Sequence, residues 1–330
     1  MRTGAHALSL LSNPLNAHVL RALESEPKPL GELRPLMGSP PQTTMRTHLR
    51  TLVAAGILER QQEPGFPGAV TYQLGGSGRR LLPVAVTLQR WLADSPGEFF
   101  SLGSPTAKSM IKALVDGWNC GVVRALAARP LALTELSRVV TGLTYPSLER
   151  RLVAMRLAGQ IERCESGGRG TPYRVTDWLR RAVAPLMASI RWERGCLREE
   201  TAPMKRIDIE SIFLLAVPLL RLGEDVSGTC RLAVEHGRSG EAKQVSGVAV
   251  EVVEGRIFSC SSKLEGRTEG WATGASSAWM HALIDHDEDS LEIGGDGRLA
   301  RELVQGLHFE LFAGSPDSQR NTLAEASSFP

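Results

Sequence analysis

The sequence contains an internal repeat of about 100 residues, and this repeat limits the folds that the chain can adopt. When the sequence is shifted by 103 positions, residues 16–60 align with residues 119–163 without a gap, and 14 of the 45 aligned positions are identical. Average residue usage would give about 3 identities. The period is longer than the roughly 20–50 residues of solenoid repeats. The first two thirds of the chain therefore contain two copies of one small domain.

Both copies have the same predicted order of secondary structure. Apolar residues at helical spacing predict three helices in each copy, at 16–25, 30–36 and 41–55 and at 119–128, 133–140 and 144–158. In the third helix, Met45, Leu49 and Leu52, matched by Leu148, Leu152 and Met155, have an i, i+4, i+7 spacing that predicts one buried stripe. Gly56 and Gly159 follow the third helix, where a left-handed residue commonly ends a helix. Two short strands come next, at 57–61 and 70–74 and at 160–164 and 172–175. Each copy ends in a longer predicted helix, at 77–94 or 177–199.

The order of three helices and a hairpin is typical of a winged helix-turn-helix. The string MRTHLRTLVAAGILER at 45–60 resembles the recognition helix and first wing strand of bacterial winged-helix transcription regulators, in particular the HxlR type and its ArsR- and MarR-like relatives. Residues 148–163 resemble it too, and the resemblance covers 8–95 and 110–195. Such regulators are usually dimers of a one-domain chain. The resemblance therefore implies a pseudo-dimer within one monomer, or a homodimer.

The resemblance also implies which residues contact DNA, because the family places base contacts on the exposed face of the third helix and phosphate contacts on the wing. Arginine pairs with guanine edges, glutamine with adenine, and threonine or serine with a base or a phosphate. The DNA-binding residues carried over are Gln42, Thr43, Arg46, Thr47, Arg50, Tyr145, Ser147, Arg150, Arg151 and the wing residue Arg169. The first wing tip, 63–68, has no cation, which departs from the family pattern. The competing interpretation is that these arginines only keep a surface solvated.

The identities between the two copies are unevenly distributed. They fall in 16–33 and 49–60, whereas 34–48, which contains the turn and the start of the third helix, has none. We therefore expect a common scaffold with two different DNA-reading faces. Neutral divergence of a duplicated domain would give the same pattern.

The charge of the chain is asymmetric. Residues 1–205 carry 27 Lys and Arg against 16 Asp and Glu, a net charge of +11, while 206–330 carry 11 against 20, a net charge of −9. A basic front predicts a polyanionic partner, here double-stranded DNA. No apolar run reaches the ~18–20 residues that a membrane span needs. We expect a cytoplasmic protein that does not associate with membranes.

The five cysteines are an odd number and lie tens of residues apart, without a CxxC pair. We expect free thiols that act as small buried apolar residues, with redox sensing by one of them as the alternative.

Residues 206–314 are predicted to form an α+β domain, and its expected helices include 209–222 and 297–305. The segments ATGASSAWMHALID and SLEIGGDGRLAREL resemble the sterol-carrier-protein-like fold, in which a sheet and helices enclose an apolar tunnel. The resemblance implies a pocket for a small apolar ligand. Its candidate lining is Leu214, Val217, Val252, Phe258, Trp271, Trp279, Met280 and Phe309. An ordinary hydrophobic core would have the same composition.

No metal site, cofactor or catalytic centre is expected. The polar run from His281 to Asp289 matches a loop after a helix as well as it matches a metal site. The sequence has no P-loop, GxSxG or HExxH motif. We therefore do not expect an enzyme.

The sequence as a whole predicts a multidomain chain with two winged helix-turn-helix domains, 1–100 and 101–205, which are α+β and mainly helical. An α+β sterol-carrier-protein-like domain follows at 206–314, with a disordered tail at 315–330. The leading hypothesis is a DNA-binding transcription regulator that responds to a ligand through its C-terminal domain. One alternative is a DNA repair or self-resistance protein that grips damaged or drug-modified DNA. Another is a ligand-carrying enzyme whose winged helices only bind other proteins.

Overall fold

The computed structural model describes residues 4–62, 70–97, 99–165, 170–197, 204–236 and 244–312. Two compact units form. The first contains residues 1–115 and 188–201, and the second contains 116–187 and 202–330. The boundaries between the units fall inside two helices, α6 (Pro105–Asn119) and α11 (Val183–Cys196). The predicted division into three domains remains a prediction.

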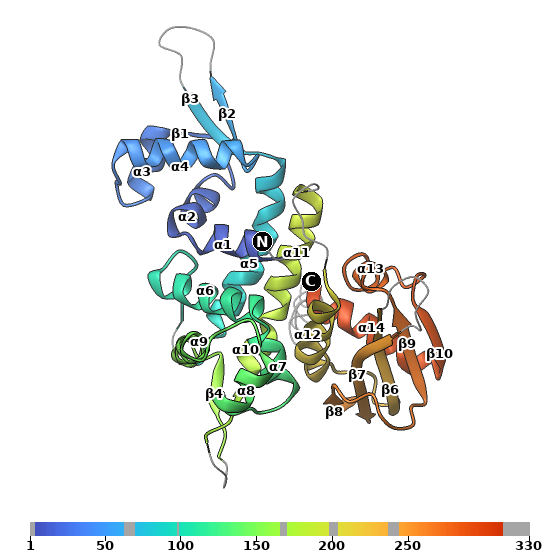
Figure 1. The fold of residues 1–330 in the computed structure, drawn as a ribbon. Coiled ribbons are helices and arrows are strands. Elements are labelled where there is room, and N and C mark those ends of the chain that lie inside the picture. Colours follow the sequence, from blue (N-terminus) through green and yellow to red (C-terminus); the bar gives the residue numbers. More distant parts are fainter. Residues whose placement is uncertain are drawn as a thin grey trace, which may run out of the picture. The chain divides into compact units, whose positions relative to one another are not determined.

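The first unit contains a helical bundle with an attached hairpin (Figure 1). Its helices are α1 (Ala5–Ser12), α2 (Pro14–Ala22), α3 (Leu30–Leu36), α4 (Gln42–Ala54) and α5 (Gly76–Ala93). The strands β1 (Lys28–Pro29), β2 (Leu58–Gln62) and β3 (Val70–Leu74) form an antiparallel sheet in the order β1-β3-β2. The core face of α4 buries Met45, Leu49 and Leu52. This i, i+4, i+7 spacing is the one that the sequence predicts.

The third helix of each copy ends in the same way. Gly56 and Gly159 have positive φ angles of 67° and 70°. In the first copy the N–H of Ile57 donates to Leu52 O and that of Gly56 to Val53 O, the two hydrogen bonds of a Schellman motif. Gln160 and Gly159 make the same pair of bonds to Met155 and Arg156. The predicted left-handed termini are thereby confirmed.

A later part of the chain completes the first unit. The Glu193 carboxylate, whose residue is 2% exposed, accepts hydrogen bonds from the N–H groups of Gly4, His6 and Ala7 at distances of 2.5, 2.7 and 3.1 Å. N–H groups at the start of a helix have no acceptor within the helix, so the carboxylate satisfies them, and a negative charge there is also favoured by the helix dipole. The neighbouring Trp192 donates from Nε1 to Ser77 O at 2.8 Å. Trp192 and Glu193 therefore fix the positions of α1 and of the start of α5 through hydrogen bonds.

The second unit begins with a similar order of elements. The helices α7 (Val122–Ala128), α8 (Leu133–Val139) and α9 (Tyr145–Leu157) precede the strands β4 (Ile161–Arg163) and β5 (Tyr173–Val175). Equivalent positions pair in both hairpins. Gln73 donates to Glu59 at 2.8 Å in the first, and Arg174 to Glu162 at 2.7 Å in the second. A short helix, α10 (Asp177–Arg181), then leads into α11.

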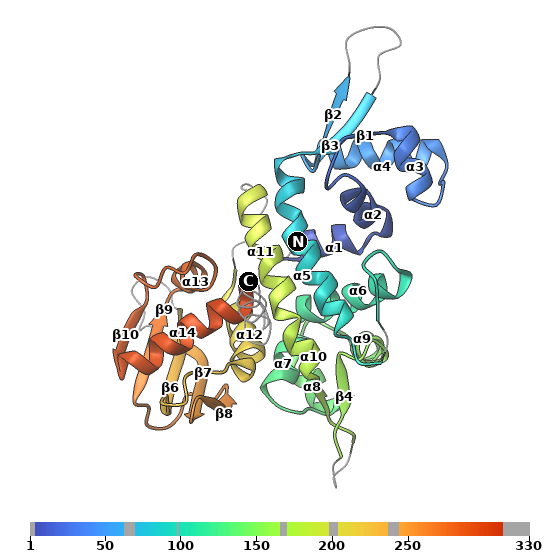
Figure 2. The same cartoon turned by 180° about the vertical axis from the view of Figure 1, so that it is seen from behind.

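The C-terminal region folds around a five-stranded sheet in the order β10-β9-β6-β7-β8, in which only β6 and β9 are parallel. The strands are β6 (Gly228–His236), β7 (Gln244–Val253), β8 (Arg256–Ser261), β9 (Gly270–Gly274) and β10 (Glu292–Gly295). Between β9 and β10 lie α13 (Ser276–Met280) and the π-helix His281–Asp285. Helix α14 (Gly297–Phe312) crosses one face of the sheet (Figure 2).

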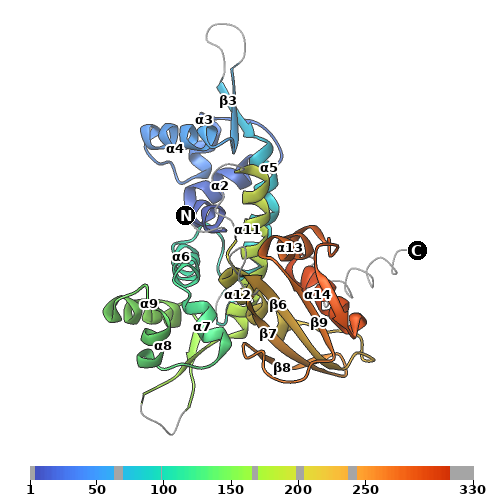
Figure 3. The same cartoon turned by 45° about the vertical axis from the view of Figure 1, so that its right-hand side comes forward.

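Helix α12 (Arg206–Ala216) is the most buried helix of the second unit, because every residue from Asp208 to Ala216 is buried. It packs against β6 and β7 on one side and against α7 and α10 on the other (Figure 3). The 3-10 turn Val217–Leu219 follows it at Pro218. Within the second unit, α12 therefore joins the repeat elements to the C-terminal sheet.

Several predicted elements differ from the structure. The apolar helix expected at 209–222 ends at Ala216, since Pro218 cannot continue the helical hydrogen bonds. The helix expected at 177–199 is divided into α10 and α11. Helix α14 continues to Phe312 instead of ending at Gln305. Strand β9 was not predicted, because GWATG is short and begins and ends with glycine.

Candidate nucleic-acid interface

Helix α4 presents polar and basic side chains on the face opposite its core residues. Gln42, Thr43, Arg46, Thr47 and Arg50 are all exposed. Pro41, with a φ angle of −53° and a ψ angle of 138°, is the N-cap residue, and α4 begins at Gln42. Because Met45, Leu49 and Leu52 are fixed in the core, the opposite face has a defined orientation relative to the domain. It offers guanidinium donors and hydroxyl groups, which are the chemistry needed for base edges and phosphates.

Helix α9 presents a different surface. Tyr145 and Arg150 are exposed, and Ser147 is half-buried and accepts a hydrogen bond from Arg150 at 3.3 Å. Arg151 is half-buried and its Nη1 lies 3.5 Å from an Asp116 carboxylate oxygen. One predicted DNA contact, Arg151, thus already has an anionic partner. The structure places the other three along the N-terminal half of α9.

The first wing tip, 63–68, and the predicted wing residue Arg169 lie outside the described residues. The same holds for residues 198–203 and for the predicted tail at 315–330.

The predicted apolar pocket residues are distributed over core and surface. Leu214, Val217, Val252, Trp279 and Met280 are buried. Trp279 packs edge-on against Phe213 with ring centroids 4.6 Å apart and donates to Ala233 O at 2.8 Å. Phe258 is 74% exposed, Phe309 is 50% exposed and Trp271 is half-buried. The structure does not bring these eight side chains together, and their role in ligand binding stays a prediction.

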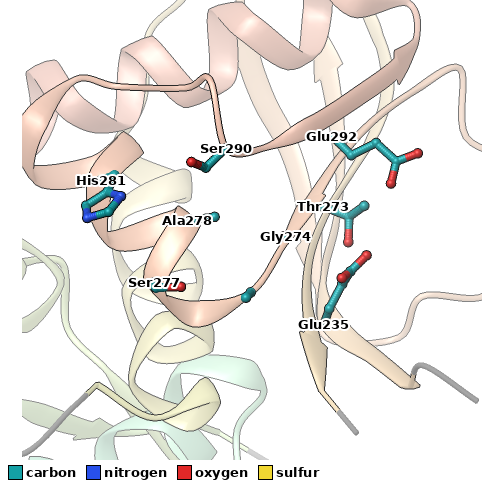
Figure 4. Close-up of a pocket in the computed structure, with 9 residues that line it drawn as sticks. Glu235, Thr273, Gly274, Ser277, Ala278, His281, Ser290 and Glu292 are labelled. Carbon is teal, nitrogen blue, oxygen red and sulfur yellow. The ribbon is translucent and has the colours of Figure 1, made fainter. Parts of the chain in front are cut away.

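A cavity of about 410 Å³ lies at the C-terminal ends of β6 and β9, next to α13. Figure 4 shows Glu235, Thr273 and Glu292 on one side of it and His281 and Ser277 on the other. Thr273 and Glu292 are direct partners across β9 and β10. The buried Thr273 hydroxyl has no hydrogen-bond partner among the residues that the structure describes. This cavity is polar and was not identified from the sequence.

The two thiols of the C-terminal region, Cys230 and Cys260, have raised pKa values. Burial raises the pKa of Cys230 to about 12. Burial also raises the pKa of Cys260 to about 12, although the Arg180 guanidinium acts in the opposite direction. A thiol reacts as its thiolate, so neither group is suited to sensing oxidants. The structure records all five cysteines as free thiols.

Within the described ranges, no group of three or more His, Cys, Asp or Glu side chains is arranged to hold a metal ion. Within the same ranges, no helix combines the length and apolar character needed to cross a membrane.

One ion cluster around a buried carboxylate was missed by sequence reasoning. Glu210 on α12, with a side chain 3% exposed, accepts hydrogen bonds from Arg124 on α7 and from the Ser246 hydroxyl on β7. Arg206 lies one helical turn away, with its Nε 3.6 Å from the same carboxylate. The only available signal was a glutamate within the apolar run IDIESIFLLA, and that signal does not name its partners.

Comparisons with known proteins match the first copy. Residues 10–98 match the family of HxlR-like helix-turn-helix proteins. Over 89 residues, 27% of this chain, the sequence is 30% identical to an uncharacterized HTH-type transcriptional regulator of Synechocystis sp.. The match spans 66% of that relative, just under two thirds of its length.

The crystal structure of diamide-treated YodB from B. subtilis is 32% identical and covers 27% of this chain and 86% of that chain, with a TM-score of 0.25. The three core-facing residues of α4, its Gly56 terminus and the β2–β3 hairpin lie within the range 10–98 that matches the family. This N-terminal part of the chain is therefore similar to an HxlR-like winged helix-turn-helix domain.

Proposed function

We propose that this protein is a transcription regulator that binds duplex DNA, with α4 as the recognition helix of its N-terminal domain. The observation that carries the proposal is the exposed set Arg46, Thr47 and Arg50 on α4, inside the range that matches HxlR-like proteins. The net charge of +11 over residues 1–205 supports it, because a basic surface attracts the phosphate backbone.

The direct test is a genomic binding selection with the purified full-length chain. The proposal predicts enrichment of a defined sequence, with footprints over it and an affinity that falls steeply between low and physiological salt. Binding to damaged or drug-modified DNA without sequence preference would instead favour the repair or self-resistance function. Negligible, salt-insensitive DNA binding would refute both.

We further propose that residues 101–205 form a second winged helix whose α9 reads an adjacent half-site, so that one chain acts as a pseudo-dimer. The element order α7, α8, α9, β4, β5 and the paired hairpin positions support this proposal. Aligned positions differ, with Arg46 matched by Glu149 and Thr47 by Arg150. We therefore expect a non-palindromic site with two segments about 10 bp apart.

Two substitutions separate the half-sites. Arg46→Ala should relax base preference in one segment and Arg150→Ala in the other, each at a cost of ~1–3 kcal/mol if the contact is to a base edge. Binding of a perfect palindrome by two chains, with both substitutions weakening both halves equally, would refute the pseudo-dimer.

A protein-binding role for the second copy is the competing candidate, and one observation favours it. On α9, Val153 is 45% exposed and Leu157 is 78% exposed, at positions aligned with Arg50 and Ala54 of α4. Exposed apolar side chains that lie one helical turn apart are typical of a protein contact. If Arg150→Ala leaves DNA affinity unchanged while Leu157→Ser abolishes self-association or capture of a partner protein, this candidate replaces the second DNA-reading helix.

Ligand sensing through the C-terminal region is the last part of the proposal. A ligand changes DNA affinity only if it binds two arrangements of the protein with different affinities. Helix α12 supports such coupling, since it contacts both the sheet and α7. If ligands found by screening bind residues 206–314 and none alters DNA affinity, the sensing proposal is wrong.

A further inference from the structure

A stripe of exposed side chains runs along α9, on the face opposite its buried residues. Its members follow one another at spacings of four, three and four residues, and we call them the α9 seam: Pro146, Arg150, Val153 and Leu157. Val153 is 45% exposed and Leu157 is 78% exposed. Alternating spacings of three and four are those with which one helix packs along another. The α9 seam is therefore suited to a helical partner.

The aligned face of the first copy lacks this apolar character. Val153 and Leu157 take the places of Arg50 and Ala54. The core residues of α4 and α9 are buried at the same spacing, so the two helices differ in what they present and not in how they are held. A partner of α9 covers apolar groups that α4 does not offer.

Two charged residues flank the α9 seam on one side. Glu149 and Arg156 are both exposed and lie seven residues apart, so they project from the same side of the helix. The flank thus carries a negative charge near one end of the seam and a positive charge near the other. The first copy has Arg46 and Val53 at these places, which are not complementary to each other.

Antiparallel pairing of two α9 helices brings these charges together. Equivalent flanks face each other in such a pair, so Glu149 of each chain lies opposite Arg156 of the other, and the two-fold axis makes this contact twice. In the same arrangement Leu157 packs against Pro146 of the other chain, and the Arg150 stem covers Val153. A parallel pair would instead place Glu149 beside the uncharged Ala154. Its own antiparallel copy therefore matches the α9 seam in both shape and charge.

We propose that, in the chain that is not bound to DNA, the α9 seam pairs antiparallel with the α9 seam of a second chain of this protein. The inference names the partner for the protein-binding candidate put forward above, and it rests on that candidate. A helix that lies in a major groove cannot hold a partner helix on the same face. The dimer and DNA contact by α9 therefore exclude each other.

The dimer is expected to be weak. The α9 seam spans two heptads, and Arg150 occupies one of its four positions. A contact of this length lies at the small end of specific interfaces, so the measurement uses about 10–200 µM of the full chain. Sedimentation equilibrium without DNA should show a concentration-dependent monomer and dimer.

Leu157→Ser tests the apolar part of the seam. It should weaken self-association at least about tenfold, because both chains lose a buried side chain. The control Leu36→Ser changes another leucine, 57% exposed on α3, and should leave self-association unchanged. A wild-type chain that stays monomeric over the whole range, or a Leu157→Ser variant that associates like the wild type, would overturn the proposal.

Reversal of the flank charges tests the antiparallel register. Glu149→Arg and Arg156→Glu each place like charges opposite one another, and each should weaken self-association roughly tenfold. A mixture of the two variants restores opposite charges at every facing pair and should associate like the wild type. If mixing them restores nothing, the proposed pairing is wrong.

A second pair of variants controls for the change in net charge. Glu24→Arg and Arg21→Glu alter the charge in the same way at exposed positions of the first copy. Neither variant nor their mixture should change self-association. An effect equal to that of the seam variants would mean that net charge, and not the seam, governs association.

DNA binding is measured separately and distinguishes this inference from the proposed function. Self-association of a chain that binds no DNA would support the dimer and refute the DNA-binding function. DNA binding by a chain that remains monomeric without DNA would refute the dimer and leave the DNA-binding function in place. If α9 also reads DNA, adding the selected duplex should dissociate the dimer.

Discussion

Arg124 on α7 and Glu210 on α12 form an ion pair whose carboxylate is buried, with Arg124 Nε 2.7 Å from Glu210 Oε2. The other carboxylate oxygen accepts from the Ser246 hydroxyl on β7. One carboxylate therefore connects the repeat elements of the second unit with its C-terminal sheet. The aligned residue of the first copy, Arg21, is exposed. Within the part of the chain that the structure describes, Arg21 forms no ion pair.

Arg124→Met should destabilise α12. Removing one partner leaves a buried carboxylate with weaker compensation from Arg206, which costs about 2–4 kcal/mol. The matched change Arg21→Met removes an exposed charge and should stay within about 0.5 kcal/mol. Native-state hydrogen exchange of the α12 amides measures the local stability of this helix in both variants. Equal protection of α12 in the two variants would show that the ion pair contributes nothing to the junction.

Cys230 and Cys260 should resist alkylation in the folded protein. With a pKa of about 12, each thiol is almost entirely protonated at pH 8. Mass spectrometry after iodoacetamide treatment should find both cysteines unmodified in the native chain and modified in urea. Modification of Cys230 at equal rates in the two conditions would contradict its burial.

Glu310 should make stability depend on pH. Burial raises its pKa to about 7, while Arg181 and Arg221 oppose this shift. The folded state therefore holds the proton more tightly than the unfolded state, whose pKa is near 4.5. The stabilisation that comes from the protonated Glu310 carboxyl is complete below about pH 4.5 and is lost as pH rises to about 7.

Glu310→Gln should remove this loss, which amounts to about 1–2 kcal/mol after allowance for solvent screening of a partly exposed group. Thermal unfolding between pH 4.5 and 8 is the measurement. The exposed Glu265→Gln serves as a control and should keep the wild-type profile. If the pH dependence of stability in Glu310→Gln ran parallel to that of the wild-type chain, the Glu310 carboxyl would be solvated and the prediction would be wrong.

The sequence predicted the local features of the first domain well. The spacing of Met45, Leu49 and Leu52 reports which face of a helix is buried, and Gly56 reports where that helix ends. Both are properties of neighbouring residues in the chain, so they can be read directly from the sequence.

Features that join distant segments could not be predicted. Glu193 caps a helix that begins nearly 190 residues earlier, and Glu210 finds partners on α7 and β7. A single sequence contains these side chains but does not state which of them meet.

The central claim, that the exposed face of α4 reads DNA, is tested most directly by the ratio of specific to non-specific affinity. The double variant Arg46→Ala/Arg50→Ala is compared with Arg79→Ala/Arg80→Ala, which removes the same charge from exposed positions on α5. Loss of base contacts lowers the ratio, whereas loss of phosphate contacts weakens both affinities alike. The account predicts a fall of at least about tenfold in the ratio for the first variant only. An unchanged ratio for Arg46→Ala/Arg50→Ala, or an equal fall in both variants, would contradict it.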